Sequence, residues 1–328
     1  MNTIAVIGSN CFTGSHIVNA LLESDGNKVF AISRSPENDD LFLPYANKRN
    51  GNFHFKQLHL LNDFKSLTDH LDAIAPEIVI NVAALSEVAL SIEVPKEYYE
   101  VNTLAVVNLC DHLRKQPYLQ KYVHISSAEI FGSCKGPVQE DSVFLPSTPY
   151  AASKAAADMY INTLIKNFNF PATIIRSTNV YGKHQQLFKI IPRTAIYLKL
   201  GKTIELHGGG SAVKSFIHVR DVVNGIMKSL ENGYSGTYHF SASSDMNVSD
   251  IVRKTCDLSG YDFENSTIET GERKAQDGRY WLDCSKSENE LGWTPKEDFE
   301  SGISETIEWI ENNWDEIKNR PLIYIHKI

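Results

Sequence analysis

The stretch that decides the fold is TIAVIGSNCFTG, residues 3–14. It opens with Thr3–Ile7, an apolar run of strand length, and it ends where a helical apolar spacing begins. In between, Gly8 and Gly14 hold the outer positions of a GxxGxxG pattern, and Cys11 stands at the middle one. Such a loop lets the backbone approach a pyrophosphate and points helix-terminal N–H groups at the anion. The stretch therefore predicts a dinucleotide-binding loop, with a plain strand, turn and helix as the alternative.

Apolar strands and helices alternate along the first half of the chain. After the first strand we expect strands at Lys28–Ser33, Phe53–Leu58, Glu77–Asn81, Tyr122–Ser126 and Ala172–Arg176. Helical spacing is found at Thr13–Leu22, Phe64–Leu71, Glu97–Leu113 and Pro149–Ile165. Strands that are apolar almost throughout need both faces covered, so the pattern predicts an α/β fold with a doubly wound parallel sheet of the Rossmann type.

The second half is less regular. Short apolar runs at Thr203–Leu206, Ser215–Val219 and Gly236–Phe240 lie among helical stretches at Val222–Leu230, Val248–Leu258 and Phe299–Asn313. We interpret these segments as a smaller C-terminal α/β lobe that binds the substrate. The expected domains are residues 1–181, the dinucleotide-binding Rossmann domain, and residues 182–328, the substrate lobe, with some segments crossing between them.

The composition limits the possible functions. The 328 residues suit about two domains. A balance of 32 Lys+Arg against 40 Asp+Glu gives a net charge of −8, and 42% of the residues are hydrophobic. These values exclude a disordered or fibrous chain, and the acidic balance argues against nucleic-acid or anionic-membrane partners. No apolar run reaches the roughly 18 residues of a membrane-spanning helix.

The cysteines are scattered and form no CxxC pair: Cys11, Cys110, Cys134, Cys256 and Cys284. This usage predicts free thiols in a reducing cytoplasm rather than a disulfide framework or a zinc site. The histidines show no metal-ligand spacing either, and we expect no metal. The N-terminus begins directly with a strand and carries no targeting pattern, which also favours the cytoplasm.

The end of the second strand indicates which dinucleotide binds. An acidic residue there accepts a hydrogen bond from the ribose 2′-hydroxyl of NAD. This chain has Ser33, Arg34 and Ser35 instead. A guanidinium between two hydroxyls fits a 2′-phosphate, so we expect NADP. NAD is the alternative, with Arg34 as a solvated loop charge that stacks on adenine.

Four polar side chains predict an active site. Tyr150 and Lys154 form a Tyr-x-x-x-Lys pair, whose spacing places both on one face of a helix. An ammonium near a phenol lowers its pKa, so that a tyrosinate can act as a base near neutral pH. The strand before them delivers Ser127 and Glu129 to the carboxyl edge of the sheet, where ligands bind in open α/β folds. Two ordinary helix residues and a strand-end carboxylate are the alternative.

Longer segments carry a family resemblance: NVAALS (81–86), SSAEIFG (126–132), PYAASK (149–154), NVYG (179–182), KIIP (189–192), DGRY (277–280) and LGWTP (291–295). Together they resemble the extended short-chain dehydrogenase/reductases, in the NAD(P)-dependent epimerase/dehydratase family. The chain is most similar there to the nucleotide-sugar dehydratases of the dTDP-glucose 4,6-dehydratase type, and the similarity runs nearly end to end.

The resemblance implies a mechanism. Tyr150 would take the C4 hydroxyl proton of a sugar nucleotide while hydride moves from C4 to the nicotinamide, and Ser127 would hydrogen-bond that oxygen. Glu129 would then remove the C5 proton, water would leave from C6, and the hydride would return to C6. The product would be a 4-keto-6-deoxy sugar nucleotide. A C4 epimerase, a decarboxylase or a 4-reductase on the same scaffold is the alternative, and a non-catalytic sugar-nucleotide or NADP(H) sensor is a remote one.

The sequence departs from the family pattern beside Glu129. The family's general acid, an aspartate, aligns with Ala128, which has no proton to donate. Water, a reprotonated Glu129 or another residue would have to act instead. Glu87 is a possible substitute, because it follows Ser86 where the family pattern has histidine; a solvated loop carboxylate is its alternative role.

The resemblance also implies binding residues and a partner. The cofactor set is Gly8, Asn10, Cys11, Phe12, Thr13, Gly14, Ser33, Arg34, Ser35, Leu60, Ala83, Ala84, Tyr150 and Lys154. The set for a nucleotide-diphosphate sugar is Ser86, Glu87, Asn179, Lys189, Lys214 and Arg279, with Lys214 in the place of the family's phosphate-binding arginine. The long helices at Glu97–Leu113 and Pro149–Ile165 would form a homodimer through a four-helix bundle, unless they only pack on the sheet.

Overall fold

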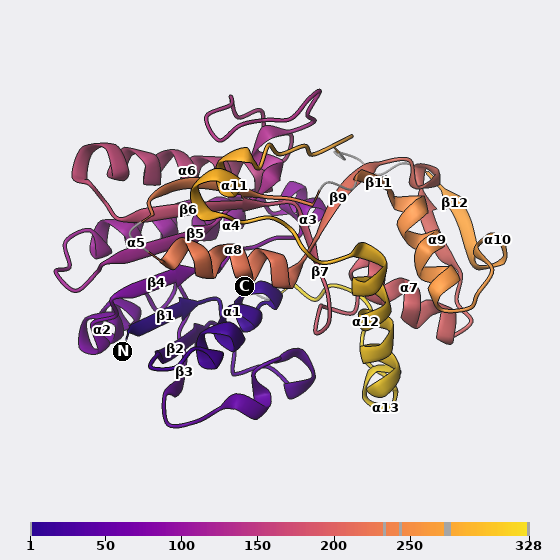
Figure 1. The fold of residues 1–328 in the computed structure, drawn as a ribbon, viewed down its shortest axis with the longest axis horizontal. Helices are drawn as coiled ribbons and strands as arrows, with labels where there is room; N and C mark the ends of the chain where they lie inside the picture. Colours follow the sequence, from indigo (N-terminus) through magenta and orange to yellow (C-terminus); the bar gives the residue numbers. More distant parts are fainter. Residues whose placement is uncertain (1, 232–233, 243–244, 272–276, 327–328) are drawn as a thin grey trace.

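A parallel sheet forms the centre of the larger lobe. The computed structural model describes residues 2–231, 234–242, 245–271 and 277–326. The sheet has seven strands in the order β10-β6-β5-β4-β1-β2-β3 (Figure 1). They are β1 (Thr3–Ile7), β2 (Lys28–Ser33), β3 (Phe53–Gln57), β4 (Ile78–Asn81), β5 (Lys121–Ile125), β6 (Ala172–Ser177) and β10 (Gly236–Phe240). Every neighbouring pair is parallel, so the doubly wound Rossmann sheet is confirmed.

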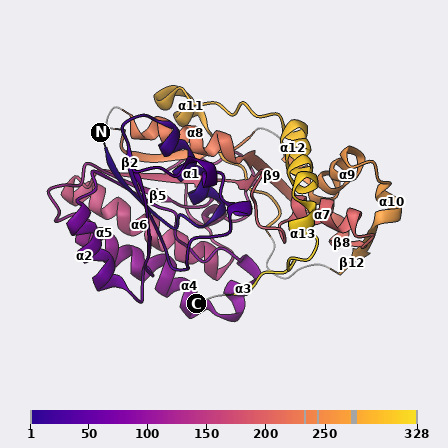
Figure 2. The same cartoon turned by 90° about the horizontal axis from the view of Figure 1, so that it is seen from below.

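Helices cover both faces of this sheet, as its apolar strands require (Figure 2). One face carries α1 (Phe12–Glu23), α8 (Val219–Leu230) and α11 (Ser285–Leu291); the other carries α2 (Phe64–Ile74), α5 (Ala105–Leu113) and α6 (Pro149–Phe168). The first core includes Ile17, Val222 and Trp293, and the second includes Leu109 and Ile161. These two cores hold the strands in place. The carboxyl ends of the strands, where the candidate site lies, therefore have a fixed position.

The larger lobe takes up segments from the second half of the chain. β10 pairs in register with β6, with Gly236 opposite Thr173, and α8 packs with α1 in one core. Our placement of Gly236–Phe240 and Val222–Leu230 in the smaller lobe is therefore wrong. A short apolar run shows that a strand is buried, but its periodicity does not show which sheet it joins.

The smaller lobe lies at the other end of the molecule (Figure 1). It holds a three-stranded sheet, β11-β9-β7, and a two-stranded one, β12-β8. Its strands are β7 (Asn179–Tyr181), β8 (Ile204–His207), β9 (Val213–His218), β11 (Asp245–Asn247) and β12 (Thr267–Thr270). Its helices are α7 (Ile190–Lys199), α9 (Val248–Leu258), α10 (Phe263–Ser266), α12 (Phe299–Asn312) and α13 (Trp314–Ile317). Ile196, Ile251 and Ile303 belong to one core of this lobe, and Phe263 of α10 belongs to a second.

The helix expected at Glu97–Leu113 is interrupted. The chain forms α3 (Val88–Glu93), α4 (Pro95–Tyr99), a π-helical turn η3 (Glu100–Leu104) and then α5. The π turn contains Asn102, which is fully buried and bonds both backbone groups of Leu85 and the hydroxyl of Ser153. A π turn often marks a functional site, and this one ties the loop after β4 to α6. Short 3-10 turns occur at η1 (Asp40–Phe42), η2 (Ala46–Lys48), η4 (Ala128–Phe131) and η5 (Gly208–Gly210).

The chain end returns from the smaller lobe to the larger one. Residues 319–326, here called the C-terminal strap, run from α13 toward α3 and α4 (Figure 2). The Tyr324 ring meets Phe188 edge-on at 5.5 Å, and His326 Nε2 lies 2.7 Å from Glu97 Oε2. The strap therefore bridges the two lobes. No helix in the described part of the chain is long and apolar enough to cross a membrane.

Candidate active site

The dinucleotide loop is tightly built against β4. A Cβ atom on Gly8, whose φ is +92°, would lie 2.6 Å from the Ala83 nitrogen, and one on Gly14 would lie 2.3 Å from the Gly8 oxygen. Cys11 caps α1, because its Sγ accepts a hydrogen bond from the Gly14 nitrogen at 3.2 Å. Burial raises the pKa of this thiol to about 11, so it stays neutral. At the middle position of the GxxGxxG pattern, this chain thus has a cysteine whose side chain caps helix α1.

Most of the predicted cofactor residues line one cavity of about 270 Å³: Gly8, Asn10, Cys11, Ser33, Arg34, Ser35, Leu60, Ala83 and Ala84. Asn10 connects the two loops of this cavity, since its Nδ2 donates to Ser35 Oγ at 3.0 Å and to the Pro36 oxygen at 2.7 Å. Arg34 is half-buried at the rim. The cavity therefore runs from the phosphate loop to the predicted ribose-reading segment.

A second cavity, of about 310 Å³, brings the catalytic residues together. Its wall includes Ser127, Glu129, Tyr150 and Lys154, together with Phe12 and Thr13 of the cofactor set. It shares Cys11 and Ala84 with the first cavity. The predicted cofactor and substrate sites thus meet at the carboxyl edge of the sheet, as expected for an open α/β fold.

The start of α6 fixes Tyr150 and Lys154. The helix begins at Pro149 directly after Thr148, whose Oγ1 accepts from the Ala151 nitrogen at 3.2 Å. Both functional side chains are buried. Burial, and then the nearby Glu129, raises the pKa of Tyr150, while a hydrogen bond from Ser127 opposes that rise. Lys154 lies one turn further along α6, and its ammonium donates to the Ile125 oxygen at 2.7 Å.

Glu129 carries a buried carboxylate in the η4 turn, which follows β5. Its backbone nitrogen donates to Ser127 Oγ at 3.2 Å in the η4 turn, and its Oε2 is buried without a hydrogen-bond partner. Burial raises its pKa to about 7, and the positive charge of Lys214 opposes this rise. A carboxylate with such a pKa can accept a proton and return it near neutral pH.

The residues present fit a nicotinamide dinucleotide. The loop is too close to its surroundings to carry side chains at Gly8 and Gly14, and it opens into the first cavity, whose far end offers the cation of Arg34. The second cavity adds Tyr150 and Lys154 beside the loop. Over the described ranges, no group of three His, Cys, Asp or Glu side chains is placed to hold a metal ion.

The family follows from the comparison with known sequences. A profile described as GDP-mannose 4,6 dehydratase matches residues 6–306. The chain belongs to this family. It is similar to the dTDP-glucose 4,6-dehydratase of Streptomyces antibioticus, with 32% identity over 260 residues that cover 78% of this chain and 77% of the relative. It also matches a trifunctional UDP-glucose 4,6-dehydratase of Arabidopsis thaliana, with 27% identity over 94% of this chain, and spans 47% of that longer protein.

Solved structures agree with this family. The dTDP-glucose 4,6-dehydratase of Streptomyces venezuelae, solved with NAD bound, is 27% identical and superposes with a TM-score of 0.88 over 96% of this chain and 98% of that one. A UDP-glucose 4-epimerase of Thermotoga maritima, at 23% identity and a TM-score of 0.86 over 95% and 99%, shares the fold. The dTDP-glucose 4,6-dehydratase of Bacillus anthracis, 27% identical with a TM-score of 0.86 over 96% of this chain and 98% of that one, was likewise solved with NAD.

The predicted substrate residues of this family member divide into two groups. Ser86, Asn179 and Lys189 line the catalytic cavity. The remaining three do not line it: Glu87 pairs with Lys189, Lys214 Nζ donates to the Asp277 oxygen at 3.1 Å, and Arg279 Nε donates to Asp245 Oδ2 at 2.7 Å. The structure thus brings half of the set to the cavity and holds the rest in ion pairs or a backbone contact.

Two residues of this dehydratase-family site were missed by our reading of the sequence. Tyr280 lines the catalytic cavity, and its hydroxyl donates to Asp277 Oδ2 at 3.1 Å. Asp277 is buried and also accepts from Ser133 at 2.9 Å and Ser147 at 2.7 Å. Both residues belong to the DGRY segment, in which we selected only Arg279. The run of large apolar residues at 280–282 in the sequence could have indicated that this segment is buried.

Proposed function

We propose that this chain is a nucleotide-sugar 4,6-dehydratase, which converts an NDP-hexose to an NDP-4-keto-6-deoxyhexose. The observation that carries the proposal is the sheltered carboxylate of Glu129 in one cavity with Ser127, Tyr150 and Lys154. Inversion at C4 needs no base for a C5 proton, whereas elimination across C5 and C6 does. A base with a pKa near 7 is suited to that proton.

The side chains divide the chemistry between them. Tyr150 accepts the proton of the C4 hydroxyl, and Ser127 donates a hydrogen bond to the same oxygen. The loop at Gly8 and the neighbouring Ala83 and Ala84 would hold the nicotinamide dinucleotide, which would supply a temporary acceptor for the C4 hydride that ends on C6. Glu129 removes the proton at C5, which the C4 ketone makes acidic, and the C6 hydroxyl leaves as water.

Glu129 can also serve as the general acid that Ala128 cannot provide. Ala128 is buried in the core beside it and has no proton to give. A Glu129 that has taken the C5 proton is a carboxylic acid whose pKa of about 7 allows it to protonate the leaving C6 hydroxyl. One carboxylate would thus act first as base and then as acid.

For the cofactor, we propose NADP. No carboxylate stands at the end of β2, and Arg34, with Ser33 and Ser35 on either side, lines the cofactor cavity. A guanidinium binds a phosphate through paired, charge-assisted hydrogen bonds. NAD, which solved relatives are described as binding, is the alternative.

For the nucleotide diphosphate, we propose that Lys189, Lys214 and Arg279 supply the cations. Lys189 lines the cavity, and the charge of Lys214 already acts on Glu129 inside it. Arg279 stacks on Trp281 at 3.7 Å and is neutralised by Asp245, so it can serve the phosphates only by leaving that pair. Asn179 offers an amide at the cavity wall.

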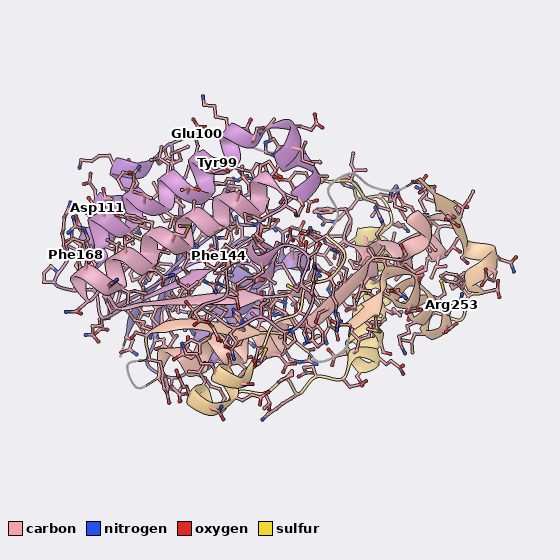
Figure 3. All side chains as sticks on the ribbon, turned by 90° about the horizontal axis from the view of Figure 1, so that it is seen from above. Tyr99, Glu100, Asp111, Phe144, Phe168 and Arg253 are labelled. Atoms are coloured by element: carbon pink, nitrogen blue, oxygen red, sulfur yellow. The ribbon has the colours of Figure 1, made fainter. Side chains whose placement is uncertain are left out.

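We also propose a homodimer through the helices of the α5 and α6 layer. Figure 3 shows these helices side by side, with Asp111 on α5, Tyr99 at the end of the preceding α4, and Phe168 at the end of α6. Most of their apolar residues face the sheet, but Tyr99, Leu104 and Met159 are exposed, Met159 by 61%. Light scattering of the wild type and of Met159→Glu tests this interface. As compartment we propose the cytoplasm, since the five thiols are free.

A panel of dTDP-, UDP-, GDP- and CDP-hexoses, analysed by mass after incubation, tests the main proposal. The dehydratase removes one water from one of these substrates. An unchanged mass with inverted C4 stereochemistry by NMR assigns an epimerase instead. Binding of a sugar nucleotide and NADP without turnover of any sugar assigns a sensor.

A further inference from the structure

A row of buried polar side chains lies beneath the catalytic lysine. Lys154 Nζ lies 3.3 Å from His124 Nε2, His124 Nδ1 lies 3.4 Å from the Tyr122 hydroxyl, and Asn81 Nδ2 lies 3.3 Å from the same hydroxyl. Tyr122 and His124 are fully buried, and Asn81 and Lys154 are exposed by 1% and 2%. The row runs from β4 across β5 to α6, and none of the proposed chemistry yet uses His124.

The contacts assign the protons in this row. An ammonium can only donate, so His124 Nε2 must be the acceptor and must carry no proton. The imidazole then carries its single proton on Nδ1 and donates it to the Tyr122 oxygen. That oxygen also accepts from Asn81 at 3.3 Å. One arrangement of protons therefore accounts for the contacts of Lys154, His124 and Asn81 in this row.

The same contacts direct the ammonium of Lys154. It has three N–H bonds, of which one is taken by the Ile125 oxygen at 2.7 Å and one by His124 Nε2. Both acceptors belong to β5 and are held by the sheet. The remaining N–H is left for the catalytic cavity that Lys154 lines. Two rigid acceptors therefore fix the direction of the third donor.

We propose that His124 is a positioning residue, which holds the Lys154 ammonium charged and directed at the catalytic cavity and so stabilises the anionic form of Tyr150 during proton transfer. This inference rests on the proposed function, because it gives Tyr150 the role of base. His124 itself touches neither substrate nor cofactor and acts only through Lys154.

The charged and titratable groups around Lys154 come from several elements. Asp158 lies one turn further along α6, and its carboxylate is paired with Arg176 of β6 at 2.9 Å. Tyr150 lies one turn before it, Tyr122 and His124 come from β5, and Cys110 comes from α5. Burial lowers the pKa of Lys154 to about 8, and Asp158 opposes this. Burial and the Lys154 charge keep the pKa of His124 well below its usual value, so it remains a neutral acceptor.

Two substitutions at position 124 separate positioning from mere packing. His124→Leu fills the space but removes the acceptor, so the ammonium loses charge and direction, and the phenolate of Tyr150 is less stabilised. We expect kcat at pH 7 to fall about tenfold, and the acidic limb of its pH profile to move up by about one pH unit. His124→Gln places an amide oxygen near the position of Nε2, and should keep the wild-type profile with kcat within about threefold.

Thr173→Val is the matched control. Thr173 is equally buried on the neighbouring strand β6, and its hydroxyl bonds the Tyr234 oxygen at 3.1 Å, away from Lys154. This variant should lose stability without moving the pH profile. An unshifted profile in His124→Leu, or an equal shift in His124→Gln, overturns the proposal.

A measurement on the protein without substrate keeps this inference separate from the proposed function. Nitrogen-15 NMR of labelled histidine reports which ring nitrogen carries the proton. We expect one histidine, identified by its loss in His124→Gln, to stay neutral and protonated on Nδ1 from pH 5 to pH 7, where Lys154 is an ammonium. A His124 that titrates in this range or is protonated on Nε2 refutes the positioning role. Failure of the wild type to turn over any sugar nucleotide refutes the proposed function instead.

Discussion

Lys189 of the smaller lobe forms an ion pair with Glu87 of the larger lobe beside the catalytic cavity. Lys189 also lines that cavity, and its charge acts on the carboxyl of Glu129 inside it. The backbone of Glu87 is also fixed, because its oxygen accepts a hydrogen bond from the Tyr98 hydroxyl at 2.5 Å. The pair therefore connects the two lobes at the point where an anionic substrate would enter.

This pair gives a test of the role of Glu87. Both partners are partly exposed, with 35% and 24% of their side chains accessible, so the pair contributes little to stability. We expect Glu87→Gln to free Lys189 for the substrate phosphates and to leave kcat within about threefold, with KM unchanged or lower. Lys189→Met should raise KM about tenfold. A fall in kcat of about 100-fold in Glu87→Gln would instead make Glu87 the missing general acid.

Tyr150→Phe should abolish turnover and leave cofactor binding intact. The substitution removes one hydroxyl from a buried ring that stays packed edge-on against Tyr98, at 6.4 Å between ring centres. Loss of a general base costs about 10²–10⁴-fold in rate. Steady-state kinetics and cofactor titration of the same preparation check this. Retained activity would remove Tyr150 from the role of base.

The sequence predicted the larger lobe well because its signals are local. The loop at residues 8–14, the apolar strands and the Tyr-x-x-x-Lys spacing all lie within single elements. Contacts between distant segments were not predictable in this way. Asp277 meets Ser133 and Ser147 from more than 100 residues away, and β10 joins the large sheet beside β6. No periodicity within one segment reports such pairings, and for the same reason His124 could not be linked to Lys154.

Glu129→Gln should stabilise the fold at alkaline pH. The pKa of Glu129 is raised from 4.5 to about 7, so the folded state holds a proton that the unfolded state has lost. The stability that this group contributes is fully present below pH 4.5 and is lost as the pH rises through about 7. The gain in Glu129→Gln should therefore grow over this range and level off at about 3 kcal/mol. Urea unfolding of both proteins at pH 5 and pH 8 measures it.

The same variant should stop the exchange of the C5 proton with deuterated solvent, while the oxidation at C4 continues. In the wild type, this exchange should rise with pH through an apparent pKa of about 7, because the base must be deprotonated. Mass analysis of recovered substrate and product gives both quantities. Continued exchange in Glu129→Gln would assign the C5 proton to another base.

Arg34→Ala should reverse the choice of dinucleotide. In the wild type we expect NADP to bind at least about tenfold more tightly than NAD, because a guanidinium at the ribose end pairs with a 2′-phosphate. Removing the guanidinium should weaken NADP and leave NAD nearly unchanged. Equal affinities of the wild type for the two dinucleotides would contradict the 2′-phosphate site.

The C-terminal strap extends this prediction to Tyr324. Its phenol lies near Arg34, whose positive charge opposes the rise that burial causes in the phenol's pKa, and its ring packs on Phe188 of the smaller lobe. Tyr324→Phe keeps the ring and removes the hydroxyl beside Arg34, so it should weaken NADP binding less than Arg34→Ala does. Tyr324→Ala removes both contacts and should also raise KM for the sugar nucleotide, because the strap then loses its hold on the smaller lobe. Isothermal titration with NADP and NAD, together with KM, separates the two contacts, and identical affinities in all three proteins would exclude the strap from the cofactor site.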